Sequence, residues 1–250
     1  MATVAQLSDP YGNHLLPVRP AGPGVCAVCG TSVRELHARC WQCSQHSKLP
    51  ARADAVGAVA LVVKRTQLAF ELAAYKSSAN PQARQLLQMG LAAVTWRWLI
   101  GHERCLAEAA GAGAGFDVVT TVPSSRGRAA HPLRDMISRQ VVPTAARHED
   151  LLEPAEPTGP EQREARAGMY RAAGTFAGRS VLLVDDTWTT GAHAQSAACA
   201  LKLAGAGPVG VLAIGRHFQP EQAGEHGTAA KDYLAQARRR GWSWSHCSRC

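Results

Sequence analysis

Short runs of apolar, largely β-branched residues alternate along the chain with longer segments in which apolar residues recur every three or four positions. The runs at 59–63, 116–122, 181–184 and 209–214 have the length and composition of buried strands. Segments with helical spacing separate them, and the succession of strand, helix and strand is typical of βαβ units. The pattern therefore predicts an α/β fold in which a parallel sheet is flanked by helices.

The longest expected helix has a clear start and a clear end. Asn80-Pro81 supplies an N-cap and a first-turn proline, and the glycines from Gly111 onward stop the apolar repeat at about residue 110. Residues 149–168 contain three prolines and several acids but few apolar residues, so we expect a mobile loop there. Shorter elements are also expected: helices at 67–75, 132–141 and 194–204, and a strand at 170–176.

Three divisions follow from this pattern in the chain of 250 residues. Residues 1–50 form an extended lead, rich in Pro and Gly up to residue 25, followed by a cysteine-rich module. Residues 51–220 form the α/β domain, and residues 221–250 form a tail that ends in a second cysteine pair. The hydrophobic fraction of 46% is that of a globular protein and excludes the disordered class.

The formal net charge of +8 changes the picture little. Basic residues are spread thinly along the chain, with one dense group at 238–240, whereas a nucleic-acid interface usually concentrates them. The charge favours a solvated surface with some attraction for phosphorylated small molecules. We find no apolar run of membrane-spanning length and no secretory signal, so no membrane partner and a cytoplasmic location are expected.

Two adjacent carboxylates, Asp185 and Asp186, lie at the carboxyl end of the most apolar run, where open α/β sheets bind ligands. A turn of threonines and glycine follows before the next helix. Carboxylates suit vicinal sugar hydroxyls, while free amides at a helix start suit a phosphate. A capping turn would explain one such residue but not all of them. The pattern predicts a sugar-phosphate site comprising Asp185, Asp186, Thr187, Thr189, Thr190, Gly191, Ala192 and His193.

The stretch from Asp185 to Gly191 resembles the phosphoribosyl-pyrophosphate (PRPP) motif of type I phosphoribosyltransferases, which has two acids, two variable residues and Thr-Thr-Gly. The resemblance covers about residues 55–218. With its cysteine-rich N-terminal module, the chain looks most similar to ComF-like members of this family. It departs from them at 127–133, where those chains usually carry Arg-Gly-Phe-Asn-Gln, and at His193, where the motif usually has Thr or Ser.

The resemblance implies further site residues. A pyrophosphate-binding loop would follow the strand ending at Val122 and would comprise Ser124, Ser125, Arg126 and Arg128. A flexible catalytic loop would correspond to 154–169 and carry Arg163 and Arg166. Alternatively, Arg126 and Arg128 could simply be solvated, and the segment with Arg163 and Arg166 could be a disordered linker.

The resemblance also implies an enzyme. Such an enzyme transfers the ribose 5-phosphate group of PRPP to a nitrogen acceptor, here an unknown base or amine, and releases pyrophosphate. Mg²⁺ and the loop arginines would neutralise the leaving group, while Asp185 and Asp186 hold the sugar. Two alternatives stay open: a non-catalytic PRPP sensor that regulates nucleic-acid binding, and a DNA-uptake accessory protein. In the second, the cysteine-rich module, which is a zinc ribbon in ComF-like chains, would contact a protein or nucleic acid. A homo-oligomer is compatible with every reading.

The cysteines form two kinds of pattern. Cys26-x2-Cys29 and Cys40-x2-Cys43 have the spacing of a closed, structural zinc site with four thiolate ligands. Cys247 and Cys250 form a third pair, again with two residues between the cysteines. That pair could complete a second zinc site with His246 and a distant ligand, compete for the first zinc, or remain unligated.

Overall fold

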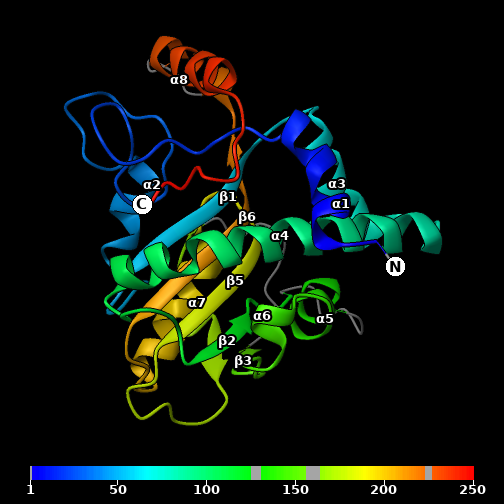
Figure 1. Ribbon diagram of the computed structural model, residues 1–250. Helices are drawn as coiled ribbons and strands as arrows, with labels where there is room; N and C mark the ends of the chain where they lie inside the picture. Colours follow the sequence, from blue (N-terminus) through cyan, green and yellow to red (C-terminus); the bar gives the residue numbers. More distant parts are fainter. Residues whose placement is uncertain (1, 125–130, 156–163, 223–226) are drawn as a thin grey trace.

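A parallel sheet forms the centre of the structure, a computed structural model that describes residues 2–124, 131–155, 164–222 and 227–250 (Figure 1). The sheet has four strands in the order β1-β6-β5-β2. All neighbouring pairs are parallel, which confirms the expected α/β class. The strands are β1 (Ala55–Val63), β2 (Val118–Thr121), β5 (Val181–Trp188) and β6 (Val209–Phe218).

The chain also runs alongside the free edge of β2. The Val119 N–H donates to the Arg147 carbonyl at 2.9 Å, and the Glu149 N–H donates to the Val119 carbonyl at 2.9 Å. This is a parallel bridge centred on His148. The path from β2 therefore first moves away from β5 and only later returns to it.

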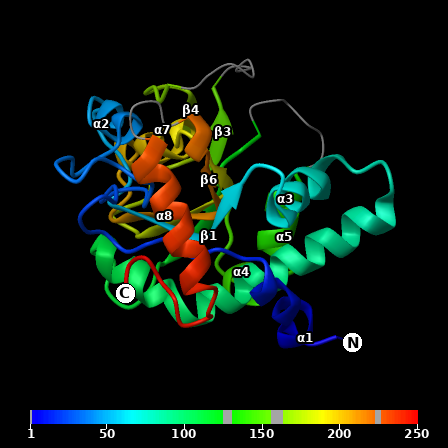
Figure 2. The ribbon, with the colours of Figure 1, turned by 90° about the horizontal axis from the view of Figure 1, so that it is seen from above.

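Helices cover both faces of the sheet, so the strands are buried on both sides and read as continuous apolar runs. One face packs against α3 (Gln67–Ser77), α4 (Pro81–Ala110) and α5 (Pro132–Arg139) through residues such as Leu182 and Val184. The other face packs against α7 (Ala192–Leu203) through Val181 and Leu183. Figure 2 shows α4 and α7 on opposite sides of the strands.

Three segments contain more structure than the sequence pattern predicts. The expected extended lead contains α1 (Val4–Ser8), closed by a capping box between Thr3 and Gln6, and the short helix η1 (Asp9–Asn13). The expected loop at 149–168 contains β3 (Leu152–Pro154), which pairs antiparallel with β4 (Tyr170–Ala172). The expected tail contains α8 (Gly227–Arg240), whose Tyr233 ring packs on Phe218.

The remaining elements are short: α2 (Trp41–His46) in the cysteine-rich module, α6 (Val142–Ala145) after α5, and η2 (Pro220–Gln222) after β6. Within the described residues, no helix is both long and apolar enough to cross a membrane.

Candidate functional site

The carboxyl ends of β2 and β5 border a switch point in the topology. After β2 the chain enters α5 on one face of the sheet, whereas after β5 it enters α7 on the opposite face. Neighbouring parallel strands whose connections diverge in this way leave a crevice at their carboxyl ends, which is where open α/β sheets bind ligands. Both segments predicted to bind a ligand, the one beginning at Ser124 and the one beginning at Asp185, leave the sheet here.

The strand expected at 181–184 extends to Trp188, so Asp185 and Asp186 lie within β5, just after Val184, the last residue paired with β2. The two carboxylates have different surroundings. Asp185 is half-buried, and its Oδ1 accepts a hydrogen bond from the Asp186 N–H at 2.9 Å. Burial and the neighbouring Asp186 charge raise the pKa of Asp185 to about 7, although the Lys76 ammonium opposes this shift. Asp186 is buried and is held by two side chains of α3: the Tyr75 hydroxyl donates to its Oδ2 at 2.6 Å, and Lys76 forms an ion pair with the same oxygen.

Tyr75 and Lys76 were not predicted as site residues. The apolar pattern at 67–75 predicts a helix, but it contains no signal that this helix ends against residues 111 positions away. A cationic and a hydroxyl side chain at a helix end are common on solvated surfaces. Only the tertiary structure brings them to Asp186.

The segment from Thr187 to Ala192 contains hydroxyl and amide groups. Gly191 adopts a φ of +83° and precedes the first residue of α7, and the Thr190 hydroxyl accepts a hydrogen bond from the Ala192 N–H at 3.3 Å. Thr187 and Thr190 are half-buried, and Thr189 is exposed. The first turn of α7 directs backbone N–H groups and a positive dipole end toward this point, which suits an anion.

Trp188 fixes the conformation of that turn. Its indole is almost fully buried, and a Cβ atom on Gly191 would lie only 2.2 Å from one of the ring carbons. The glycine is therefore required by the packing of the turn as well as by its left-handed backbone. Gly191 was predicted as a site residue, but Trp188 was not.

His193, at the start of α7, links the two sides of the crevice. Its Nδ1 lies 2.8 Å from the hydroxyl of Tyr170 on β4, and that hydroxyl lies 3.4 Å from the carbonyl of Pro123, just after β2. Burial lowers the pKa of His193, which favours its neutral form over an imidazolium.

The other predicted residues divide into two groups. Ser124 is half-buried and lies shortly after β2. The backbone N–H of Arg166 donates to the Ser196 hydroxyl of α7 at 2.8 Å, although Arg166 is largely exposed. Arg166 is thus placed beside α7. Ser125, Arg126, Arg128 and Arg163 lie outside the described residues.

The four cysteines of the N-terminal module converge as predicted. The sulfurs of Cys26, Cys29, Cys40 and Cys43 all lie within 4.8 Å of one another. The distance from Cys29 Sγ to Cys40 Sγ is 3.8 Å, which matches the separation of about 3.8 Å between two sulfurs on one tetrahedral zinc. The Cys26 and Cys40 sulfurs also accept N–H donors, at 3.3 and 3.5 Å. The cluster fits a zinc ribbon.

A buried arginine connects this cluster to the turn after β5. Arg216, on β6, donates to the Cys29 carbonyl at 3.1 Å and lies 3.3 Å from the Cys29 sulfur. Its other donor group reaches the carbonyls of Trp188 and Thr189 at 3.2 and 3.3 Å. His46, on α2, adds an edge-on contact with the Trp188 ring at 6.1 Å. The cysteine module therefore contacts, through Arg216 and His46, the turn that is predicted to bind the phosphate.

Cys247 and Cys250 do not join this first cluster. Their ligand atoms group with those of His102 and Cys105 on α4. His246 is not in the group: its Nε2 accepts a hydrogen bond from Arg240 at 3.2 Å. The residues beside Cys247 and Cys250 are therefore two residues of the long helix, and one of them, Cys105, forms a disulfide with Cys250.

We compared the chain with models of known protein families, with curated proteins and with solved structures, and none of them matches. A functional assignment must therefore rest on the residues of this chain.

Proposed function

We propose that the chain binds PRPP in the crevice between β2 and β5 and transfers its ribose 5-phosphate group to a nitrogen acceptor. The observation that supports this most strongly is the position of Asp185 and Asp186. They lie in the carboxyl-terminal half of the central strand β5, just past its last residue paired with β2 and at a topological switch point, and a turn of hydroxyl and amide groups follows the strand.

Each group has a role that matches its chemistry. The carboxylates of Asp185 and Asp186 accept hydrogen bonds from the ribose hydroxyls, and the turn from Thr187 to His193 holds the 5′-phosphate with amides and hydroxyls. The half-buried Ser124 begins the segment that would bind the diphosphate. In this arrangement, the sugar lies across the ends of β2 and β5.

The reaction requires no nucleophilic side chain. A bond forms between the acceptor nitrogen and C1 of the ribose, the bond from C1 to the diphosphate oxygen breaks, and pyrophosphate leaves with the electron pair. The acceptor nitrogen loses its proton. The ionised carboxylates of Asp185 and Asp186 lie near the ribose, where they stabilise the positive charge that develops on the ring.

The donor set is compatible with Mg²⁺, because carboxylate and hydroxyl oxygens together with substrate phosphates are the ligands that this ion prefers. Asp185 and Asp186 would hold it, and its charge would neutralise the leaving diphosphate.

Lys76 competes with the substrate for the carboxylate of Asp186. It is paired with Asp186 in the structure, so the ribose hydroxyls must share this carboxylate with the ammonium or displace it. The Lys76 charge also opposes the rise in the pKa of Asp185, which helps to keep this carboxylate ionised near neutral pH. Lys76 is therefore a positioning residue in this proposal.

Calorimetry with Mg²⁺ and PRPP tests the site. Asp186→Asn keeps the shape of the side chain but removes its charge, and losing a charge-assisted hydrogen bond costs about 1.5–3 kcal/mol. We expect binding to weaken about tenfold to a hundredfold. Asp232→Asn, at an exposed position on α8, is the matched control and should bind like the wild type. Equal binding by Asp186→Asn, or no binding by the folded wild type, would overturn the proposal.

Turnover is tested separately by measuring pyrophosphate release from PRPP in the presence of a panel of bases and amines. Release that depends on one acceptor and is lost in Asp186→Asn supports the transferase. Tight PRPP binding without release for any acceptor would instead support a PRPP-sensing protein.

A further inference from the structure

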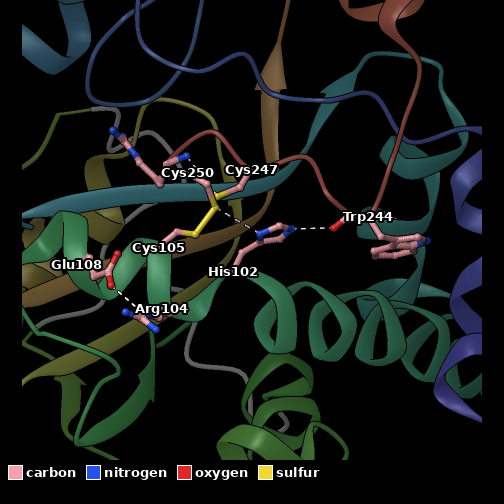
Figure 3. The surroundings of a disulfide bond; sticks show 8 residues. His102, Arg104, Cys105, Glu108, Trp244, Cys247 and Cys250 are labelled. Carbon is pink, nitrogen blue, oxygen red and sulfur yellow. Dashed lines mark hydrogen bonds and ion pairs between the residues drawn. A yellow bond between two sulfur atoms is a disulfide. The ribbon is translucent and has the colours of Figure 1, made fainter.

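Two segments far apart in sequence bring four metal-ligating side chains to one point beside α4 (Figure 3). His102 and Cys105 come from the helix, and Cys247 and Cys250 come from the segment after α8. Their ligand atoms all lie within 4.8 Å of one another. We propose that these four residues bind a second structural zinc ion, independently of the proposed transferase site.

The spacing and distances match those of a tetrahedral site. His102 and Cys105 are three residues apart on a helix, so their side chains share a face. Cys247 and Cys250 have the same separation as each pair in the first cluster. Cys250 Sγ lies 3.6 Å from His102 Nδ1, and a sulfur and a nitrogen on one tetrahedral zinc are separated by about 3.6 Å.

The surroundings of the ligands support a metal site independently of these distances. The Nε2 of His102 lies 2.8 Å from the Trp244 carbonyl, which can only accept, so Nε2 carries the proton and Nδ1 presents its lone pair to the sulfurs. Metal-binding histidines are typically oriented in this way. The Cys247 sulfur accepts the Arg249 N–H at 3.2 Å, as the Cys26 and Cys40 sulfurs accept N–H donors in the first cluster.

The structure joins Cys105 and Cys250 in a disulfide, which uses two of the four groups. That bond does not require the thiol of Cys247 or the ring of His102 at the same point, whereas zinc uses all four. The two states exclude each other. A thiol reductant supplies two electrons and two protons to convert the disulfide into two thiols, and Zn²⁺ then displaces three protons from Cys105, Cys247 and Cys250.

The second site would also secure the first. Arg249 lies between the two cysteines of the pair, and its guanidinium donates to the Val56 carbonyl at 2.6 Å and to the Ala27 carbonyl at 3.1 Å. It also donates to the Val28 carbonyl. Ala27 and Val28 form the turn between Cys26 and Cys29. Zinc at the second site would therefore fix Arg249 where it holds the ribbon against β1.

The decisive experiment counts zinc per chain by elemental analysis and native mass spectrometry, in protein purified under a phosphine reductant. We expect two ions in the wild type and one in Cys247→Ser. This variant is informative because it removes one zinc ligand and leaves both Cys105 and Cys250 in place. Cys40→Ser should also retain one ion, held at the second site. Cys199→Ala, a buried cysteine outside both clusters, is the control and should retain two.

A second variant covers the case in which Cys247→Ser fails to fold. Cys247→His replaces one zinc ligand by another and should restore two ions per chain. One ion in the reduced wild type, two ions in Cys247→Ser, or an intact Cys105–Cys250 disulfide in the peptide map of the reduced protein would each overturn the proposal.

Discussion

Gly191 is constrained twice, by its own backbone and by the indole of Trp188. Its φ of +83° lies in the left-handed region, and a Cβ atom would lie 2.2 Å from a carbon of the buried ring. A glycine before a helix is a familiar sequence signal for a phosphate turn. The clash with Trp188 could not be inferred from sequence, because it depends on how the indole packs beneath the turn.

We therefore expect Gly191→Ala to destabilise the fold even without ligand. Forcing a methyl group into a packed site costs about 1–3 kcal/mol, in addition to the left-handed backbone. Gly111→Ala is a matched control, because Gly111 has a φ of +80° and a Cβ atom added there would have no neighbour within 4 Å. Thermal unfolding of both variants separates the two effects. If the two melting temperatures fall equally, Trp188 does not constrain the turn.

Asp185 should reduce the stability of the folded chain at neutral pH. Its pKa is raised from 3.8 to about 7 by burial and by Asp186, so between these pH values the folded state retains a proton that the unfolded state releases. Its contribution to stability therefore falls as pH rises from about 4 to 7 and stays low above that range. A carboxylate retained at such a cost is typical of functional sites.

Asp185→Asn should consequently raise the melting temperature at pH 8, by about 2–4 °C for each kcal/mol recovered in a chain of this size. Asparagine keeps the oxygen that accepts the Asp186 N–H. The difference from the wild type should close below pH 4, where the Asp185 carboxyl is protonated in both the folded and the unfolded state. Melting curves across this pH range, with Asp232→Asn as control, check the sign. A lower melting temperature at pH 8 would contradict the assigned pKa shift.

The elements that the sequence predicted best are those with a strong period or a clear cap. The strands and α4 follow from apolar runs and from Asn80-Pro81, and the structure contains all of them. The strands are longer than the apolar runs: β1 begins at Ala55, β5 ends at Trp188 and β6 ends at Phe218. The strand expected at 170–176 corresponds to β4, which is shorter, whereas β3 was not predicted, because it has only three residues and lies in a segment with few apolar residues. The signal for α8 was present: Ala230, Tyr233, Leu234 and Ala237 have helical spacing.

Some contacts of the site join different helices and strands, and the sequence does not predict them. Lys76 reaches Asp186 from α3, and Arg216 joins β6 to both Cys29 and the turn at Trp188. No local pattern distinguishes these side chains from other basic residues. Their roles arise from packing between segments that are more than 25 residues apart.

A substitution of Arg216 tests whether the cysteine module supports the turn after β5. Arg216→Lys keeps the charge but loses the planar group that reaches Cys29, Trp188 and Thr189 together. Each hydrogen bond of this kind contributes about 1.5–3 kcal/mol. We expect a lower melting temperature and PRPP binding weakened on the order of tenfold, measured by calorimetry. Arg239→Lys, at an exposed position of α8, should change neither. Unchanged PRPP binding by Arg216→Lys would show that the cysteine module does not support the turn.

At the scale of the whole molecule, the two cysteine clusters and the crevice form one connected structure. Arg216 links the first cluster to the turn after β5, and Arg249 links it to the segment that carries Cys247 and Cys250. The sequence predicted the ribbon as a separate module, since its four cysteines suffice for a closed site. It is attached to the sheet by apolar packing of residues such as Val25 and Val33 and by two arginines, whose partners are backbone carbonyls and the Cys29 sulfur. No local pattern in the sequence indicates these contacts.

Removing a cysteine of the first cluster should therefore affect the turn at 187–191 as well as the ribbon. Cys40→Ser leaves three ligands, and we expect hydrogen exchange to increase at 26–50 and also at 187–191, because Arg216 and His46 lose their fixed positions. The core of α4 should stay protected, since α4 packs in a different apolar cluster from the ribbon. Cys199→Ala serves as the control. Increased exchange confined to 26–50, with the turn as protected as in the wild type, would show that the ribbon folds beside the site without supporting it.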